Sequence, residues 1–98
     1  MEARSLCYEA QKLIAEGALL IDVRTAAEFK KGALDGAINI PLTTLKQCSL
    51  GVPAFKPILL YCVAGILSYE GKQVLEEKGH RNVYDLGCYQ ELLDCVHS

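Results

Sequence analysis

The sequence predicts an α/β domain with a mostly parallel sheet and helices on both faces of that sheet. Two runs, Ala18 to Val23 and Ile58 to Cys62, are short and nearly all apolar, as is typical of strands buried on both sides. Segments with helical spacing of apolar residues alternate with these runs, which favours parallel strands joined by helices. The 98 residues, 51% of them hydrophobic, fit a single domain over residues 1–98.

The N-terminal part of the chain predicts a helix, a strand and a second helix. We expect the first helix from Ser5, which is suited to capping its start, to Glu16, with Gly17 as the stop. The apolar face of this helix comprises Leu6, Ala10, Leu13 and Ile14. The strand Ala18–Val23 comes next. Thr25 and Glu28 then have the spacing of a capping box, which predicts a short helix.

The remaining elements continue the alternation. In chain order we expect a brief strand over 36–41, a turn or two of helix over 42–48, a loop over 52–57, the strand 58–62, a helix over 68–78 ended by Gly79, a strand over 82–86 and a short helix over 89–95. In a parallel sheet of this kind, sites form in the loops beyond the carboxyl ends of the strands. Cys62 is at such an end.

The five cysteines show no paired spacing. An odd number without close pairs indicates reduced thiols, and it favours neither a disulfide framework nor a zinc site. The cysteines are Cys7, Cys48, Cys62, Cys88 and Cys95. We expect no metal and no organic cofactor.

Charge and hydropathy exclude two classes of partner. The net charge is −2 and only Lys30 and Lys31 are adjacent basic residues, so no positive stripe is available for a nucleic acid. No apolar run approaches the roughly 20 residues of a membrane span, and no N-terminal export signal is evident. We therefore expect a cytoplasmic protein that binds neither nucleic acid nor membrane.

Cys62 is the candidate nucleophile because of the segment that comes directly after it in the chain. Gly65 lets the backbone curl, and inward amides over residues 63–68 would form a nest around the sulfur. The start of a helix near Ser68 would add its positive end and favour the thiolate. The alternative is that Cys62 is a small apolar residue ending a buried strand. Local features alone leave both interpretations open.

The order of the motifs resembles the rhodanese-like sulfurtransferase domain over nearly the whole chain. The segments that carry the resemblance are "LLIDVRTAAEFKKGALDGAINIP", "ILLYCVAGILS" and "KGHRNVYDLG". The family pattern D-x-R-x-x-x-E-[FY] is matched by Asp22, Arg24, Glu28 and Phe29, and G-H-I-x-G-A-x-N-I-P is matched by Gly32, Gly36, Ala37, Asn39, Ile40 and Pro41. The resemblance implies a three-layer domain with a five-stranded parallel sheet and Cys62 as the catalytic sulfur carrier. It also implies an active-site loop made by Val63, Ala64, Gly65, Ile66, Leu67 and Ser68.

The chain departs from the family pattern in this loop. Where the family often has C-R-S-G-x-R-S, Val63 and Leu67 occupy the two arginine positions and Ala64 the first serine position. Those arginines hold anionic donors, so we expect weak use of thiosulfate and better use of a persulfide or polysulfide. Ala33 and Leu34 replace the family's His-Ile pair. The family's strand-end L-x-G-G appears here as Leu86, Gly87, Cys88 and Tyr89, either shortened by one residue or without its glycine pair. Related phosphatases need an arginine at the position of Ser68, which argues against that activity.

Other chemically capable residues have simpler explanations. Asp22, Arg24 and Glu28 are expected to hold the second strand to its helix. His80 and His97 have no partner at ligand spacing and are expected to be solvated or capping residues. Cys88 could resolve a persulfide into a disulfide, although packing is the preferred role. Tyr61 and Tyr69 are expected to be core or wall residues.

The sequence therefore predicts a rhodanese-type sulfurtransferase in which the Cys62 thiolate takes up a sulfane sulfur and passes it to a nucleophile. The expected partners are a small sulfur donor and a thiol acceptor, either a small molecule or a protein. The alternative is a non-catalytic binding or regulatory module, which the missing loop arginines favour and the presence of Cys62 disfavours. Related domains also occur fused to redox enzymes such as coenzyme A disulfide reductases, and the chain could be such a domain.

Overall fold

The protein is described by a computed structural model that covers residues 3–63, 65–90 and 92, with only the backbone described for residues 3–7. The helices are α1 (Ala3–Ala15), α2 (Ala26–Lys31), α3 (Leu42–Gln47) and α4 (Ile66–Glu77), and the strands are β1 (Leu19–Asp22), β2 (Ile38–Asn39), β3 (Ile58–Cys62) and β4 (Val83–Cys88). Tyr89, Gln90 and Leu92 are helical, and the rest of the helix expected over 89–95 lies outside the described residues. The predicted alternation of strands and helices is confirmed.

The strands form one parallel sheet in the order β2-β1-β3-β4. The described residues contain four strands, so the fifth strand that the family resemblance implied is not among them. The apolar runs of the sequence itself predicted four strands, over 18–23, 36–41, 58–62 and 82–86, and each of them is present. The remainder of the expected fold, a parallel sheet between helices, is confirmed.

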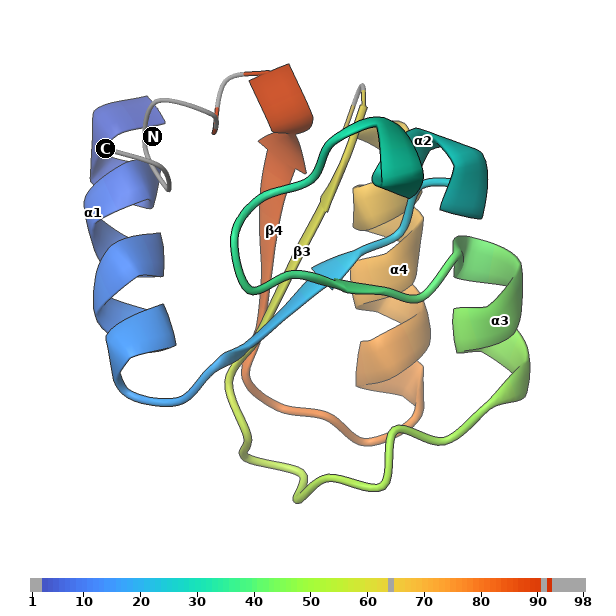
Figure 1. Ribbon diagram of the computed structural model, residues 1–98. Coiled ribbons are helices and arrows are strands. Elements are labelled where there is room, and N and C mark those ends of the chain that lie inside the picture. Colours follow the sequence, from blue (N-terminus) through green and yellow to red (C-terminus); the bar gives the residue numbers. More distant parts are fainter. Residues whose placement is uncertain (1–2, 64, 91, 93–98) are drawn as a thin grey trace.

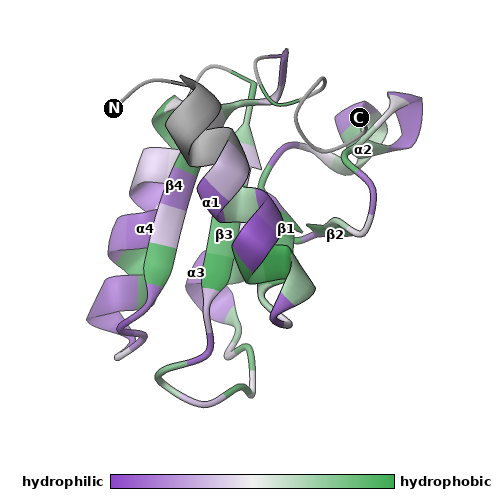
Figure 2. Ribbon diagram, turned by 90° about the vertical axis from the view of Figure 1, so that its left-hand side faces the viewer, coloured by the Kyte–Doolittle hydropathy of each residue, from purple (hydrophilic) through white to green (hydrophobic). Residues whose placement is uncertain are grey.

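Helices cover both faces of the sheet, as Figure 1 shows, with α1 on one side and α3 and α4 on the other. Strand β3 is central and every residue in it is buried, and Figure 2 shows it as largely hydrophobic. On the α1 face, the core comprises Ala10, Leu20, Leu34, Leu59, Tyr61, Leu86 and Leu92. On the opposite face, it comprises Ile21, Val23, Leu42, Leu45, Ile58, Leu60, Cys62, Leu75 and Val83. The Cys62 side chain therefore belongs to the face that α4 covers.

Helix boundaries differ from expectation at two starts. Helix α1 begins at Ala3, so Ser5 lies within its first turn and does not cap it. Helix α4 begins at Ile66, two residues before the expected Ser68, because Gly65 takes the N-cap position with a left-handed backbone (φ 84°). Because glycine has no side chain that could cap the helix, the free N–H groups in the first turn of α4 need another acceptor.

Capping at the other helix ends follows the sequence closely. Thr25 and Glu28 form the complete capping box that was predicted at the start of α2. At the end of α4, the Gly79 N–H donates to Glu76 O and the His80 N–H to Leu75 O, which is the hydrogen-bond pattern of a Schellman motif. His80 thus caps through its backbone. This is one of the two roles expected for it. The residue is partly exposed, and its Nδ1 is buried without a hydrogen-bond partner among the described residues.

The longest helix in the described part of the chain has 13 residues, and none there combines the length and apolar character that crossing a membrane requires.

Candidate active site

Cys62 is placed at the carboxyl end of the central strand, directly before the turn into α4. Its side chain is only 1% exposed. The sulfur accepts two backbone hydrogen bonds, from the Gly65 N–H at 2.9 Å and from the Ser68 N–H at 3.3 Å. Ser68 is the third residue of α4, and its N–H is one of the donors that a helix leaves without an intrahelical partner. The Cys62 sulfur therefore fills the role of a capping side chain for α4.

The Ser68 hydroxyl adds a third polar group beside the sulfur. Ser68 is fully buried, its Oγ lies 3.3 Å from Cys62 Sγ, and it donates to the Gly65 carbonyl oxygen, also at 3.3 Å. The thiol donates to this hydroxyl in the structure. Because a hydroxyl hydrogen can rotate, Ser68 can instead donate to the sulfur once the thiol has lost its proton. The Ser68 hydroxyl is therefore a side-chain donor for the Cys62 sulfur in addition to the backbone N–H groups, and the sequence did not indicate it.

Fewer backbone N–H groups bind the sulfur than the sequence indicated. Of the described residues in the loop, Gly65 and Ser68 donate to the sulfur, whereas Val63, Ile66 and Leu67 make no hydrogen bond to it. Ala64 lies outside the described residues. Ile66 and Leu67 form the first turn of α4, so their N–H groups have no intrahelical partner either. Backbone donors beyond those on the sulfur are therefore present at the same helix end.

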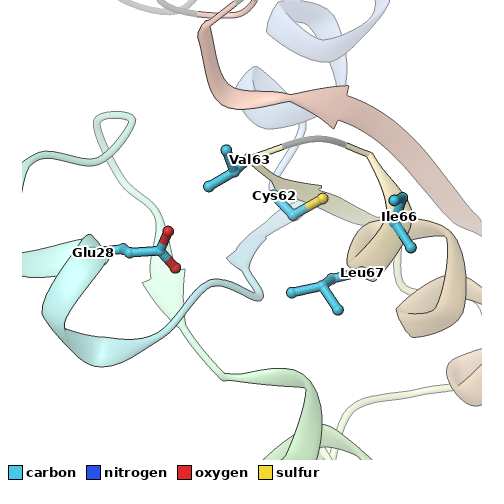
Figure 3. A pocket seen from close by; sticks show the side chains of 5 residues that line it. All are labelled: Glu28, Cys62, Val63, Ile66 and Leu67. Carbon is cyan, nitrogen blue, oxygen red and sulfur yellow. The ribbon is translucent and has the colours of Figure 1, made fainter.

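A pocket of about 260 Å³ opens at Cys62, and it is lined by Glu28, Cys62, Val63, Ile66 and Leu67 (Figure 3). Val63, Ile66 and Leu67 are well exposed, Ile66 at 67%. Large apolar side chains that stay exposed around a concave site are typical of a surface that meets a ligand or a partner. Two of the three are the residues that stand in the arginine positions of the family loop.

Glu28 brings a carboxylate to this pocket from α2 (Figure 3). The capping role predicted for Glu28 is confirmed, but its place in the pocket wall was missed. The topology held a usable signal, because α2 comes after β1 and β1 pairs directly with β3. Residues just beyond the carboxyl ends of neighbouring parallel strands are brought to one side of a sheet.

Asp22 and Arg24 form a buried pair at the carboxyl end of β1. Arg24 Nη2 lies 2.7 Å from Asp22 Oδ2, and Arg24 also donates to the Gly32 carbonyl oxygen. The hydrogen bond with Asp22 raises the pKa of Arg24, although burial opposes the shift. The guanidinium lies over the ring of Tyr89, 4.1 Å from its centroid. This network ties β1 to the segments around it, in agreement with the scaffold role predicted for the pair.

Tyr61 is a core residue, as expected, and Tyr69 is not. Tyr61 is fully buried, and its hydroxyl accepts the Leu34 N–H at 3.1 Å. Burial raises the pKa of Tyr61 far above its ordinary value, with the Leu34 hydrogen bond acting against the shift, so Tyr61 stays protonated and is unsuited to act as a base. Tyr69, in the first turns of α4, is 57% exposed.

The other described cysteines are free. Cys48 is exposed, and Cys88 is partly buried and pairs in register with Cys62 across β3 and β4. The expected position of Cys88 at the same sheet edge is confirmed. Cys7 has only its backbone described, and Cys95 and His97 lie outside the described residues. Within residues 3–63, 65–90 and 92, no three His, Cys, Asp or Glu side chains gather in a way that would hold a metal ion.

Comparison with known proteins places this geometry in a family. The Bacillus subtilis (strain 168) protein YqhL is 42% identical over 69 residues, which are 70% of this chain and 55% of YqhL. Thiosulfate sulfurtransferase PspE of Escherichia coli (strain K12) is 34% identical over 74 residues, 74% of this chain and 71% of PspE. The chain thus spans little more than half the length of the first of these relatives.

The solved structure of the human single-domain sulfurtransferase TSTD1 has the same fold. It superposes with a TM-score of 0.77 at 26% identity, and the match covers 88% of this chain and 90% of that one. The family model for the rhodanese-like domain matches residues 7–91. The chain belongs to the rhodanese-like domain family.

Proposed function

We propose that the protein is a sulfurtransferase in which Cys62 carries a sulfane sulfur as a persulfide. The observation that supports this most is the pair of N–H groups, from Gly65 and Ser68, that donate to the Cys62 sulfur at the start of α4. Hydrogen bonds from N–H groups and the positive end of a helix both stabilise an anionic sulfur. Relatives such as PspE and TSTD1 carry the name sulfurtransferase, which supports the same class.

The transfer takes place in two steps. In the first, the Cys62 thiolate attacks the outer sulfur of a protonated donor persulfide, RS–SH. A bond forms between Cys62 Sγ and that sulfur, the donor's own S–S bond breaks and RS⁻ leaves; the proton of the transferred S–H then passes to RS⁻, so that RSH is released and Cys62 holds an anionic persulfide. In the second step an acceptor thiol gives its proton to the outer sulfur of the Cys62 persulfide, and the resulting acceptor thiolate attacks that sulfur. A new S–S bond forms to the acceptor, the S–S bond to Cys62 breaks, and Cys62 leaves as a thiolate. Covalent catalysis in this form divides one exchange between two simpler displacements.

The first turn of α4 supplies donors for the transferred sulfur in this proposal. Gly65 and Ser68 already hold the inner sulfur. The N–H groups of Ile66 and Leu67 have no intrahelical partner. We assign them to the outer sulfur, whose negative charge they would stabilise without a charged side chain.

We further propose that thiosulfate is a poor donor for this protein. The described lining of the pocket includes a carboxylate and three apolar side chains but no lysine or arginine. Thiosulfate is a dianion, and recognition of such groups depends strongly on bidentate or point-charge cations. A persulfide or polysulfide donor and a thiol acceptor suit this pocket better.

Mass spectrometry of the Cys62 peptide tests the proposal. Incubation with polysulfide should add about 32 Da per sulfur atom, and a thiol acceptor should remove the added mass. Cys62→Ser should abolish both events, because a hydroxyl is too weakly acidic to carry sulfur, and circular dichroism should show an intact fold. Cys88→Ser is the matched control and should retain both.

Two outcomes would contradict the proposal in different ways. A wild-type chain that never gains the mass, or gains it and cannot pass it on, would support the binding module instead. Transfer that persists in Cys62→Ser but is lost in Cys88→Ser would show that Cys88, on the neighbouring strand β4, carries the sulfur.

A further inference from the structure

The two carboxylate oxygens of Glu28 have different surroundings. Oε1 accepts the Thr25 N–H and the Thr25 hydroxyl, both at 3.1 Å. Oε2 receives no hydrogen bond from the described part of the chain, and no lysine or arginine described there pairs with this carboxylate. The capping box therefore fixes the side chain through one oxygen and leaves the second without a protein donor.

The carboxylate points toward the pocket that Cys62 also lines (Figure 3). The remaining walls come from Val63, Ile66 and Leu67, which are uncharged. Beside apolar walls the field of a charge is screened less than in open water. A molecule that enters to react at the sulfur thus meets one negative charge that no lining residue offsets.

We propose that Glu28 is a specificity-determining residue that selects against sulfur donors and acceptors with an anionic group next to the reacting sulfur. Thiols that are neutral or cationic at that position are the substrate class that the pocket favours. This inference rests on the proposed sulfurtransferase function and deepens it. Anionic substrates lack the loop arginines that would attract them, and the Glu28 carboxylate also repels them. The apolar walls suit the hydrocarbon part of such a thiol.

The second displacement shows how the selection acts on an acceptor. The acceptor's sulfur must reach the outer sulfur of the Cys62 persulfide, which brings its neighbouring group into the pocket beside Glu28. An anionic group at that place is repelled by the carboxylate and a cationic group is attracted. The bonds that form and break are the same for every thiol, so only the encounter with Glu28 differs between them.

Three acceptors with the same two-carbon spacer test this directly: cysteamine, 2-mercaptoethanol and 2-mercaptoethanesulfonate carry a cation, a neutral group and an anion at the end of that spacer. Glu28→Gln removes the charge, and it keeps the capping box because Gln is accepted there. The measured quantity is the rate at which each thiol removes the added sulfur from Cys62 in Glu28→Gln relative to wild type. This ratio cancels the intrinsic reactivity of each thiol.

The ratio should rise about threefold for the anionic thiol, stay near one for the neutral thiol and fall by a similar factor for the cationic thiol, as befits a partly exposed charge. Added salt should shrink the contrast. Glu76→Gln, which removes an exposed carboxylate from the other end of α4, should give the same ratio for all three thiols. Equal ratios in Glu28→Gln as well would overturn the inference.

Alkylation of Cys62 separates this inference from the proposed function. Iodoacetate and iodoacetamide differ by one negative charge and need no sulfur transfer. The rate with iodoacetate relative to iodoacetamide should rise about threefold in Glu28→Gln at Cys62, and it should not change at the exposed Cys48. If Cys62 never accepts sulfur but this contrast is found, the sulfurtransferase proposal fails while the role of Glu28 stands. If Cys62 transfers sulfur and neither contrast is found, the role of Glu28 fails alone.

Discussion

The carboxyl ends of β1 and β3 lie side by side in the sheet and differ in the groups that surround a buried acceptor: a charged partner at the end of β1 and only uncharged donors at the end of β3. At the end of β1, Asp22 is fully buried, and its carboxylate accepts hydrogen bonds from Arg24 Nε, from Arg24 Nη2 and from the Arg24 N–H. At the end of β3, the Cys62 sulfur is also buried, but its hydrogen-bond partners are two backbone N–H groups and the neutral Ser68 hydroxyl.

The difference separates a structural pair from a reactive centre. The β1 end has no net charge, because the buried Asp22 carboxylate and the buried Arg24 guanidinium neutralise each other and form hydrogen bonds within the chain. The β3 end supplies donors but no charge, so an anion on the sulfur would complete it. We therefore expect changes at the β1 end to alter the stability of the fold and changes at the β3 end to alter the reactivity of Cys62.

Removing the cation from the β1 end should have the largest effect on stability. Arg24→Leu keeps an apolar stem but leaves Asp22 buried without its partner, which should lower the free energy of unfolding by about 3–5 kcal/mol. Urea denaturation measures this loss. Lys46→Ala is the matched control, since Lys46 forms an exposed ion pair with Glu70 at 3.7 Å, and its removal should cost less than about 1 kcal/mol. Equal losses in the two variants would show that the β1 pair is not the support we describe.

Gly65→Ala should act on both properties, because Gly65 has a left-handed backbone and also donates to the sulfur. A side chain in that conformation costs about 1–2 kcal/mol. Alanine keeps the backbone N–H, but relaxation of the strained backbone should move that N–H away from the ionised sulfur and so slow alkylation of Cys62 about tenfold. Gly79→Ala introduces a comparable strain at φ 98°, at the opposite end of α4. It should reduce stability while leaving the alkylation rate at Cys62 unchanged. A slower rate in Gly79→Ala would show that strain anywhere in α4, and not the position of Gly65 beside the sulfur, controls the reactivity of Cys62.

Tyr61→Phe should affect one property, stability, where Gly65→Ala affects two. The variant removes the acceptor of the Leu34 N–H, and an unsatisfied buried donor costs about 1–3 kcal/mol. Tyr84→Phe serves as a control, because the Tyr84 hydroxyl is bound to Asn82 at an exposed site, where water can replace it. Thermal unfolding measures both. A change in sulfur uptake by Tyr61→Phe at unchanged stability would give this ring a chemical role that we do not assign to it.

The smallest change is expected when a cation is added to the rim of the β3 site. Leu67→Arg should speed persulfide formation from thiosulfate about fivefold and change the rate with polysulfide less, since a partly exposed cation attracts the dianion. Leu67→Gln, which is polar but uncharged, should leave the rate with thiosulfate as it is. Efficient use of thiosulfate by the unmodified chain would show that the missing arginines matter less than proposed.

The sequence predicted what is local and missed what depends on contacts between distant segments. The capping box of Thr25 and Glu28 and the strand that ends at Cys62 are determined by neighbouring residues alone. The start of α4 was placed two residues late because its cap is a sulfur, which no capping preference includes. Likewise, the stacking of Arg24 on Tyr89 joins residues 65 positions apart, and no local pattern announces it.

Glu28 was missed for a different reason. Its spacing from Thr25 already explained why a glutamate stands there, so nothing in the sequence called for a second role. Only the pairing of β1 with β3 brings α2 to the pocket at Cys62. A residue with a sufficient structural explanation can thus also contribute to a site.

The capping box has an evolutionary consequence. A single nucleotide change converts a glutamate codon into a glutamine codon, and glutamine at residue 28 keeps the hydrogen bonds that start α2. The charge at the pocket can therefore be lost in one mutational step without loss of the helix. Substrate preference in this protein is open to selection at a position where the fold imposes no barrier between the two states.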